Sequence, residues 1–333
     1  MERVLVTGGC GFIGSHFVRM LIRERDVAVV NLDALTYAGN PANVADVADD
    51  ARYRFVHGSI TDPAAVTEAG RDCDTVVNFA AETHVDRSIR QAGDFIQTDV
   101  YGTHVLLEHV KERGGRLLHV STDEVYGDIE PGARSREGDA LRPSSPYSAS
   151  KAGGDLQVMA YVRTYGLDAV VTRGANNYGP NQYPEKLIPL FVTNLLDGEP
   201  VPVYGDGQQA RDFTWVEDHC RGILTALERG AAGEIYNVGS GQEVENLETT
   251  RRLLELTGRD ESYVRHVTDR AGHDRRYALD CSKLTALGWS PQVEFGEGLA
   301  RTVDWYRDNR AWWEPIKHGG GFAEYRALQY GTR

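Results

Sequence analysis

The segment Thr7-Gly8-Gly9-Cys10-Gly11-Phe12-Ile13-Gly14-Ser15-His16 follows a short apolar run and carries the pattern G-x-G-x-x-G at Gly9, Gly11 and Gly14. With Gly8 it also satisfies G-x-x-G-x-x-G. Such glycines allow a tight turn, a close approach of the backbone to a pyrophosphate, and packing of the next helix against the strand. The helix N-terminus adds N–H donors for an anion. Because a glycine-rich turn is a weak signal alone, its surroundings decide its meaning.

Asp33 places a carboxylate at the position where dinucleotide-binding proteins bind a ribose. A second apolar run, at 28–32, is followed by Asp33, nineteen positions after Gly14. A carboxylate at this distance from the glycine-rich turn accepts hydrogen bonds from a ribose 2′-OH. Ala34 comes next, so no arginine is present there to receive a 2′-phosphate. The sequence therefore predicts NAD, rather than NADP, as the cofactor.

Short apolar runs alternate with helix-like stretches over the first half of the chain. We expect strands at 3–6, 28–32, 53–56, 75–79, 116–120 and 168–171, and helices at 15–25, 63–70, 93–113 and 146–165. This order predicts an α/β fold with a Rossmann-type, doubly wound parallel sheet. After residue 172 many turns interrupt the pattern, which indicates a smaller α/β C-terminal lobe. We expect an NAD-binding domain with the catalytic residues at 1–172 and a mainly substrate-binding lobe at 173–333, with the chain crossing between them.

Composition argues against several classes of protein. The 333 residues carry a net charge of -13, 41% hydrophobic and 26% charged residues, and four scattered cysteines. Disordered and disulfide-scaffold proteins do not fit these values, and a reducing compartment is favoured. An acidic chain without a basic run does not suit nucleic acid, and no apolar run approaches the ~20 residues that span a bilayer. Since the N-terminus lacks a signal-peptide pattern, we expect a cytoplasmic protein without membrane association.

A tyrosine and a lysine stand four positions apart in Tyr147-Ser-Ala-Ser-Lys151, at the start of the helix expected at 146–165. This spacing puts the phenol and the ammonium on one helix face. Because a phenol has an ordinary pKa of about 10, it acts as a base near neutrality only if a partner such as Lys151 lowers that pKa. The pattern is common by chance. Here it follows a dinucleotide motif and a strand that leads into Ser121-Thr-Asp-Glu-Val-Tyr-Gly127, at the edge where such sheets bind ligands.

Together these motifs make the chain resemble the extended short-chain dehydrogenases/reductases, and among them the dTDP-glucose 4,6-dehydratase family. The resemblance covers nearly the whole chain. It includes Asp-Ala-Leu-Thr-Tyr-Ala-Gly-Asn at 33–40, Ala-Ala-Glu-Thr-His-Val-Asp-Arg-Ser at 80–88, Asn-Asn-Tyr-Gly-Pro at 176–180, Glu-Lys-Leu-Ile-Pro at 185–189 and Arg-Thr-Val-Asp-Trp-Tyr at 301–306.

The most diagnostic part of the resemblance is Thr122-Asp123-Glu124. Related nucleotide-sugar epimerases usually carry small hydroxyl residues there, and similar GDP-mannose dehydratases and UDP-glucuronate decarboxylases tend to show Thr-Ser-Glu. An isolated acidic pair at a strand end is more often merely solvated. Here three motifs converge on one edge of the sheet, so the pair favours the dTDP-glucose type.

The resemblance implies an NAD-dependent hydro-lyase of deoxysugar biosynthesis, which converts dTDP-glucose to dTDP-4-keto-6-deoxyglucose and water. Tyr147, with Lys151, would take the proton of the C4 hydroxyl, oriented by Thr122, while C4 is oxidised. Glu124 would remove the C5 proton, and Asp123 would protonate the departing C6 hydroxyl. That role needs a protonated Asp123, and burial beside a second carboxylate raises a pKa in that direction. Reduction at C6 regenerates NAD, which is expected to stay bound.

The resemblance also assigns binding residues. For NAD it implies Gly8, Gly11, Phe12, Ile13, Gly14, Asp33, Ser59, Ile60, Ala80 and Ala81, with Tyr147 and Lys151. For the nucleotide sugar it implies His84, Ser88, Asn177, Lys186, Leu187, Pro202, Tyr204, Arg211, Asn246, Arg270 and His273. Cations suit a diphosphate, although a surface salt bridge is the commoner explanation for any one basic residue. No second histidine stands at metal spacing from His273, so no metal site is expected.

Three positions depart from the family's usual pattern. Ser59 stands where an aspartate usually contacts adenine, Asp99 replaces a customary asparagine, and Ala34 replaces a common lysine. Asp99 is expected to alter hydrogen bonding near the active-site helix, because a carboxylate cannot donate as an amide does. None of the three removes a proposed catalytic group.

Two alternatives stay open. A nucleotide-sugar 4-epimerase needs the tyrosine, the lysine and NAD, but it does not need Asp123 and Glu124. A dinucleotide-sensing Rossmann protein need not keep the tyrosine and lysine, so their presence counts against that class.

The resemblance further implies a homodimer, in which the helices at 93–113 and 146–165 pair across a two-fold axis. Both stretches contain apolar residues that suit such a face.

Overall fold

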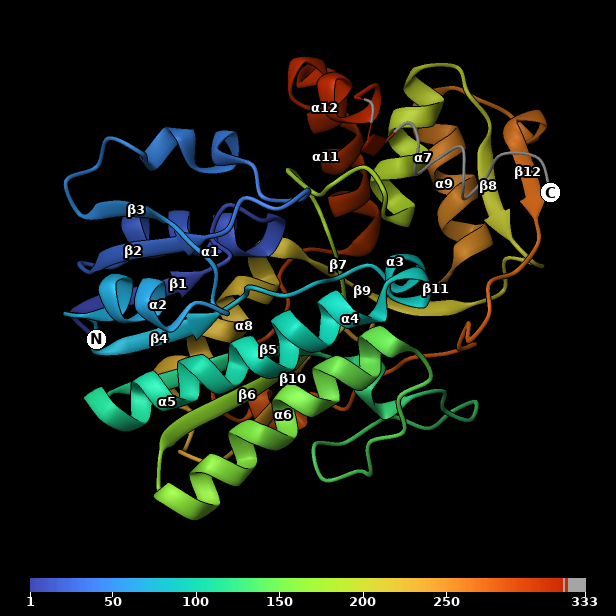
Figure 1. Cartoon of the computed structure of the whole chain (residues 1–333). Coiled ribbons are helices and arrows are strands. Elements are labelled where there is room, and N and C mark those ends of the chain that lie inside the picture. The colour runs from blue at the N-terminus through green and yellow to red at the C-terminus, as the bar shows by residue number, and fades with distance from the viewer. Residues whose placement is uncertain (320, 323–333) are drawn as a thin grey trace.

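A computed structural model of the chain describes residues 1–319 and 321–322, so the end of the lobe expected to reach residue 333 lies outside the described residues. Within this part of the chain, seven parallel strands form a central sheet in the order β10-β6-β5-β4-β1-β2-β3 (Figure 1). The strands are β1 (Arg3–Thr7), β2 (Ala28–Asp33), β3 (Tyr53–His57), β4 (Thr75–Asn78), β5 (Arg116–Thr122), β6 (Asp168–Gly174) and β10 (Ile235–Val238). The predicted doubly wound α/β fold is confirmed.

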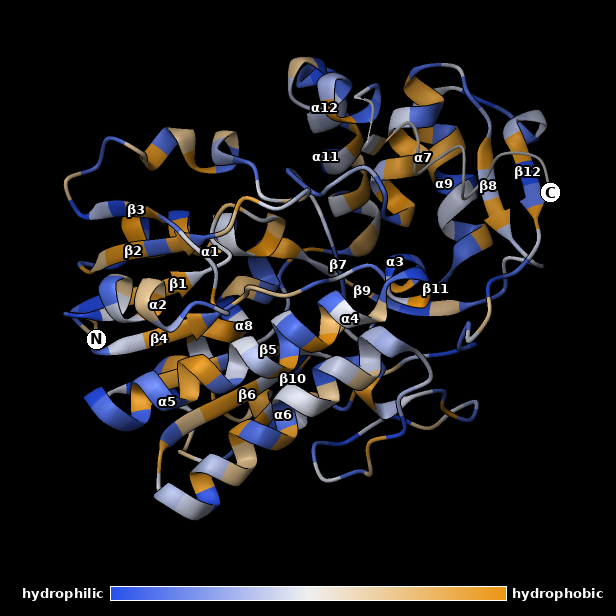
Figure 2. Cartoon of the chain, viewed as in Figure 1, coloured by the Kyte–Doolittle hydropathy of each residue, from blue (hydrophilic) through white to orange (hydrophobic). Residues whose placement is uncertain are grey.

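Burial on both faces explains why the strands are continuous apolar runs rather than alternating ones. In β1, Val4 and Val6 face the side covered by α1 (Phe12–Glu24) and α8 (Val216–Arg229), whereas Leu5 faces the opposite side. Figure 2 shows the hydrophobic colour along these central strands. The helices on the second face are α2 (Pro63–Gly70), α5 (Thr103–Arg113) and α6 (Pro146–Tyr165).

Local sequence determines where α6 begins and ends. The Ser145 hydroxyl accepts from the backbone N–H of Ser148 at 3.1 Å, and Ser148 returns a bond to the backbone of Ser145. This reciprocal cap, with Pro146 in the first turn, starts the helix immediately before Tyr147. Gly166 ends it with a φ of 70°, a conformation that favours glycine.

The helix expected at 93–113 is interrupted. It consists of α4 (Ala92–Phe95), a π-helical turn (Ile96–Gly102) and then α5. Such π turns are rare and are frequent at functional sites, and this one carries Asp99. Sequence periodicity alone does not distinguish a π turn from a continuous α-helix.

The order of the strands reverses between β1 and β4. From β1 the chain builds outward through β2 and β3, then returns to the other side of β1 for β4, β5 and β6. All of these neighbours are parallel, so their carboxyl ends lie at one edge. Open α/β sheets bind ligands at such a reversal.

The smaller lobe lies at this carboxyl edge (Figure 1). In one of its sheets β9 (Ala210–Trp215) lies between β11 (Glu243–Glu245) and β7 (Asn176–Tyr178), and in the other β12 (Val264–Val267) pairs with β8 (Val201–Tyr204). Its helices are α7 (Leu187–Leu196), α9 (Asn246–Thr257), α11 (Phe295–Asp308) and α12 (Arg310–Lys317). Shorter helices are α3 (Val85–Arg90), α10 (Ser282–Thr285) and the 3-10 helices Pro41–Val47, Asp123–Tyr126 and Glu261–Tyr263.

The chain crosses between the lobes more than once. After β7 and β9 have formed in the smaller lobe, α8 and β10 return to the central sheet, where β10 pairs with β6. β10 is not among the predicted strands, because its four residues are too short a run to stand out from a turn-rich region. None of the helices within residues 1–319 and 321–322 combines the length and the apolarity that crossing a bilayer requires.

Candidate active site

A cavity of about 420 Å³ opens at the carboxyl edge of the central sheet. Its walls are the loops after β1 to β5, the start of α6 and residues of the smaller lobe. With one exception, described below, the residues predicted to bind or react line this cavity.

At two positions of the glycine-rich loop, neighbouring backbone atoms lie so close that only glycine fits. Gly8 has a φ of +71°, and a Cβ there would lie 2.7 Å from the backbone nitrogen of Ala80. A Cβ on Gly14 would lie 2.3 Å from the carbonyl oxygen of Gly8. Phe12 and Ile13 open α1 beside them and also line the cavity. The arrangement gives an anion close access to the helix N-terminus, and the residues present fit a dinucleotide pyrophosphate.

The end of β2 forms the next part of the wall. Both oxygens of the buried Asp33 carboxylate accept backbone N–H groups, from Cys10 and Leu35, each at 2.8 Å. Each carboxylate oxygen can accept a second bond, so the group can still receive a ribose hydroxyl. Ser59 and Ile60 follow β3 and line the same end of the cavity. Ala80 and Ala81 follow β4, and these short side chains line the cavity as well.

The acid pair lies where β5 ends. The Thr122 hydroxyl accepts from the backbone N–H of Glu124 at 3.3 Å and donates to Oδ1 of Asp123 at 3.2 Å. Burial raises the pKa of Asp123 well above its ordinary range, and the neighbouring Glu124 adds to the increase. Burial also raises the pKa of Glu124, against the opposing charge of Arg270. The expected shift of Asp123 toward its protonated form is therefore present.

Tyr147 and Lys151 lie side by side in the cavity wall, but their electrostatics differ from the expectation. The Lys151 ammonium donates to the carbonyl of Val120 at 2.8 Å. Burial raises the pKa of the Tyr147 phenol well above its ordinary value, and Glu124 adds to the increase. In this arrangement the loss of water and the nearby carboxylates outweigh any stabilisation of the phenolate by Lys151, so the condition for a base near neutrality still requires a further positive charge.

Three positively charged side chains lie at the far end of the cavity. Arg211 is 5% exposed and donates to the carbonyl of Asp274 at 2.8 Å, so its charge is not cancelled by that partner. Arg270 lies 3.6 Å from Asp86, and the Lys186 ammonium donates to a backbone carbonyl. A surface salt bridge therefore does not describe Arg211. The other predicted residues that line this end are His84, Asn177, Leu187, Pro202, Tyr204, Asn246 and His273.

Ser88 is the exception. Its side chain is fully buried, and its hydroxyl donates to the carbonyl of Val85 at 2.7 Å, one turn earlier in α3. This bond holds Ser88 behind the wall that the described residues form. The prediction that Ser88 contacts a ligand in this cavity is therefore not supported.

Three further residues that line the cavity were not predicted from the sequence: Tyr37, Asp86 and Glu185. The Tyr37 hydroxyl donates to Glu185 at 2.8 Å, and Arg87 pairs with Glu185 at 2.9 Å while lying 3.8 Å from the centre of the Tyr37 ring. The Tyr204 hydroxyl donates to Asp86 at 3.2 Å. The available signal was their position, since all three lie inside segments that carry the family resemblance.

Asp99 fits its position as an acceptor. One carboxylate oxygen accepts the backbone N–H of Glu82 at 3.1 Å, and the other accepts the hydroxyl of Ser150 at 2.6 Å. Burial raises the pKa of Asp99 to about 6, while Lys151 opposes the shift. Compared with an asparagine, the aspartate keeps two hydrogen bonds but adds a buried charge.

The comparison with known proteins begins with a family model described as GDP-mannose 4,6 dehydratase, which matches residues 5–302. The chain is 54% identical over 322 residues to the dTDP-glucose 4,6-dehydratase of Streptomyces niveus, which covers 95% of this chain and 96% of that protein. Nearly the whole length of both proteins is therefore compared.

Solved structures also match nearly the whole chain. DesIV, a dTDP-glucose 4,6-dehydratase from Streptomyces venezuelae with NAD and TYD bound, is 56% identical with a TM-score of 0.93, over 95% of this chain and 100% of that chain. The UDP-glucose 4-epimerase of Thermus thermophilus in complex with NAD is 34% identical with a TM-score of 0.86, over 92% of this chain and 100% of that chain.

We expect Asp99→Asn to stabilise the protein, and to do so more at pH 8 than at pH 5. The folded state holds the Asp99 proton up to a pKa of about 6, whereas an unfolded aspartate releases it near its ordinary pKa of 3.8. Stability therefore falls as pH rises through this window, and the amide removes the loss, so its advantage should grow by about 1 kcal/mol between the two pH values.

Denaturant unfolding at both pH values measures this difference. The matched control is Asp49→Asn, at an exposed position, which should show the same small effect at each pH. An Asp99→Asn variant that is destabilised equally at both values would contradict the expectation.

Proposed function

The chain belongs to the dTDP-glucose 4,6-dehydratases, within the family described as GDP-mannose 4,6 dehydratase, and we propose how its cavity carries out their reaction. The protein is an NAD-dependent hydro-lyase that converts dTDP-glucose to dTDP-4-keto-6-deoxyglucose and water. The observation that carries the assignment of roles is the pair of Asp123, which is buried, and Glu124, which is half-buried, beside Tyr147 in one cavity with the glycine-rich loop.

NAD fits the half of the cavity that the central sheet builds. Gly8, Gly11 and Gly14 leave space for the pyrophosphate, and the Asp33 carboxylate can accept a ribose hydroxyl. The residues proposed to hold the rest of the cofactor are Phe12, Ile13, Ser59, Ile60, Ala80, Ala81, Tyr147 and Lys151. The chemistry that NAD supplies when bound is a positive charge and a reversible two-electron oxidation.

In the proposed reaction, Tyr147, Glu124 and Asp123 each take up or donate a proton. Tyr147 takes the proton of the C4 hydroxyl, which Thr122 orients, and Lys151 supports the phenolate against the cost of burial. The 4-ketone acidifies the C5 proton, which Glu124 removes. Asp123 donates its proton to the C6 hydroxyl, which departs as water. The raised pKa of Asp123 suits this acid, because it favours the protonated form that must donate.

The opposite end of the cavity suits the nucleotide. Arg211, Arg270 and Lys186 bring positive charge that a diphosphate can neutralise, while Tyr204 and Leu187 offer packing surface for a base. The remaining proposed contacts are His84, Asn177, Pro202, Asn246 and His273. In this proposal the smaller lobe binds the nucleotide sugar, and the central sheet binds NAD.

The acid pair is what separates the dehydratase from an epimerase on the same scaffold. A 4-epimerase needs the Tyr147 base and NAD, but it breaks no C5–H or C6–O bond. Two carboxyl groups with raised pKa, one buried and one half-buried, would then be costly without a role. The elimination of water gives each of these two carboxyl groups a role.

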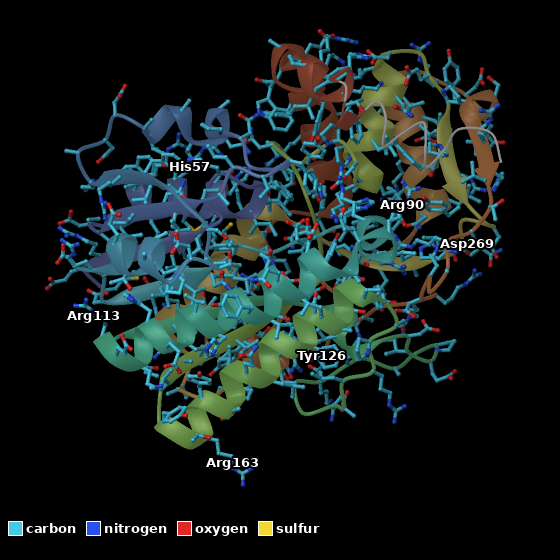
Figure 3. The ribbon with its side chains drawn as sticks, viewed as in Figure 1. His57, Arg90, Arg113, Tyr126, Arg163 and Asp269 are labelled. Carbon is cyan, nitrogen blue, oxygen red and sulfur yellow. The ribbon has the colours of Figure 1, made fainter. Side chains whose placement is uncertain are left out.

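We also propose a homodimer. Four large apolar side chains are exposed along the π-helical turn and α6, and α6 packs beside that turn and α5. These residues are Ile96, Tyr101, Leu156 and Tyr165, at 53%, 41%, 62% and 55% exposure. Figure 1 shows α5 and α6 running side by side, and Figure 3 shows Arg163 pointing away from the end of α6. Such an apolar face with a charged edge suits a second copy of the chain.

A cytoplasmic location is part of the same proposal. The cysteines of the described residues are free, and Cys10 and Cys220 are buried among apolar side chains. A reducing compartment suits such unpaired cysteines.

The first test is product formation by the purified protein. Incubated with dTDP-glucose and no added NAD, it should form a 4-keto-6-deoxy sugar nucleotide, detected by its ultraviolet absorbance in alkali and by the mass loss of one water. Asp123→Asn and Glu124→Gln should each lower the rate by about 10²- to 10⁴-fold, because each loses a proton transfer. The control is Glu255→Gln, at an exposed position on α9. Amide variants as active as wild type would instead favour the epimerase.

The glycine-rich loop gives a second prediction, measured on the cofactor itself. Gly14→Ala places a Cβ 2.3 Å from the carbonyl oxygen of Gly8, so the loop must shift away from the pyrophosphate. We expect the purified variant to retain at least tenfold less NAD, measured by the nucleotide released on denaturation. Gly138→Ala is the control, because no described atom lies within 4 Å of its Cβ. Equal retention in both variants would argue against the proposed cofactor site.

Light scattering tests the dimer. The mass at micromolar concentration should be twice 36.8 kDa. Leu156→Glu should lower that mass toward the monomer, since it places a charge in the proposed apolar face. Leu256→Glu, on α9 and 37% exposed, is the control that should leave the dimer intact. A monomeric wild-type protein would refute the homodimer.

A further inference from the structure

The carboxylate of Glu185 connects three segments that lie far apart in the sequence. Glu185 lies just before α7 and is buried, with 3% of the residue exposed. Its Oε1 accepts the hydroxyl of Tyr37 at 2.8 Å, and its Oε2 accepts Nε of Arg87 at 2.9 Å. Tyr37 follows β2 and Arg87 lies in α3. A buried carboxylate with both oxygens bound in this way is satisfied, so the contact does not pay the cost of an isolated buried charge.

The ring of Tyr37 is packed as well as hydrogen-bonded. The guanidinium carbon of Arg87 lies 3.8 Å from the centre of the Tyr37 ring. The ring of Tyr183, two residues before Glu185, packs against it in a T-shaped arrangement with 5.3 Å between ring centres. A cation over an aromatic face and a T-shaped ring pair are both attractive arrangements. The hydroxyl that reaches Glu185 therefore belongs to a ring whose position is fixed by its neighbours.

Tyr37 lies in the middle of the loop at 34–40, which follows the proposed ribose-binding carboxylate. One end of this loop is tied by the backbone N–H of Leu35, which donates to Asp33 at 2.8 Å. The other end is tied by the backbone N–H of Asn40, which donates to a carbonyl of the glycine-rich loop at 3.0 Å. Most residues of the 34–40 loop line the cavity. The Tyr37 hydroxyl ties the middle of this cavity wall to the smaller lobe.

We propose that the contact between Tyr37 and Glu185 closes the cavity over NAD and keeps the cofactor bound between turnovers. This inference rests on the proposed cofactor site, in which a ribose at Asp33 lies beside the wall that the 34–40 loop forms. NAD leaves faster when that wall is free to move. Because the proposed reaction regenerates NAD in each turnover, slow release of NAD does not slow catalysis. Tyr37 and Glu185 are positioning residues here, since they act on NAD through the loop.

Tyr37→Phe keeps the ring and removes only the hydroxyl, so it tests the contact directly. Holoenzyme loaded with isotopically labelled NAD is mixed with excess unlabelled NAD, and the label that stays on the protein is followed with time. We expect the label to leave the variant about 10- to 100-fold faster than it leaves wild type, because a hydrogen bond to a charged group contributes a factor of about that size. The measurement needs no substrate.

Glu185→Gln changes the other side of the same contact and gives an independent measurement. It removes the charge that the Tyr37 hydroxyl and Arg87 share, so it should also speed the exchange of NAD. In the double variant, the increase should be smaller than the product of the two single increases, because both changes weaken one contact. If one variant does not fold, the other still tests the contact.

Tyr263→Phe and Glu243→Gln are the matched controls. The hydroxyl of Tyr263 accepts from Arg259 at 3.1 Å, and Glu243 pairs with Arg276 at 2.7 Å. These four residues lie outside the cavity lining. Each control loses a polar contact of the same kind as the variant it matches, and each should exchange NAD at the wild-type rate.

Several results would overturn the proposal. Exchange at the wild-type rate in both Tyr37→Phe and Glu185→Gln would show that the contact does not hold NAD. Equally fast exchange in the controls would show a general loosening of the fold. A raised KM for dTDP-glucose with unchanged NAD exchange would place the pair at the substrate instead.

The proposed function can fail separately from this inference. Wild-type protein that retains labelled NAD but forms no product would contradict the reaction and leave the role of Tyr37 and Glu185 to be decided by the exchange rates. Wild-type protein that binds no NAD would overturn both proposals.

Discussion

The parallel pairing of β1 with β4 is the constraint on which the site depends. The two strands run in register to their carboxyl ends, where Thr7 stands opposite Asn78 and donates to its side chain at 2.6 Å. The next residue, Gly8, comes so close to Ala80 that only a glycine fits. Since β5 continues the register beyond β4, the acid pair after Thr122 lies at the same edge. The cofactor loop and the reacting groups meet because β1 and β4 end level at Thr7 and Asn78, and β5 extends past them at the same edge as far as Thr122.

Burial at that edge determines the protonation of the reacting groups. Loss of water favours the neutral forms of Asp123, Glu124 and Tyr147, and carboxylates near one another strengthen the effect. For the proposed acid this is useful, because it must hold a proton at neutral pH. For the proposed base it is a cost, which a positive charge beside it must offset. Burial therefore opposes the phenolate of the proposed base and favours the neutral form of the proposed acid.

The path of the chain makes the two lobes one unit. The smaller lobe supplies the cations and packing surface at one end of the cavity, yet α8 and β10 return from it to the central sheet. Side chains add a second connection, since Tyr37 after β2 donates to Glu185 before α7. These connections fix the position of the residues at one end of the cavity relative to those at the other.

The sequence by itself determined the parts that depend on neighbours in the chain. The strands of the first half, the glycine-rich turn and the cap that starts α6 before Tyr147 all follow from local patterns, as do the acid pair and its link to one family. The tertiary structure decided what depends on distant contacts. It added β10 to the sheet, joined Asp86 to Arg270, turned Ser88 away from the cavity and raised the pKa of Tyr147. The physical reason is that burial and charge pairing depend on which residues meet in space, and a short apolar run or a lone carboxylate does not specify that.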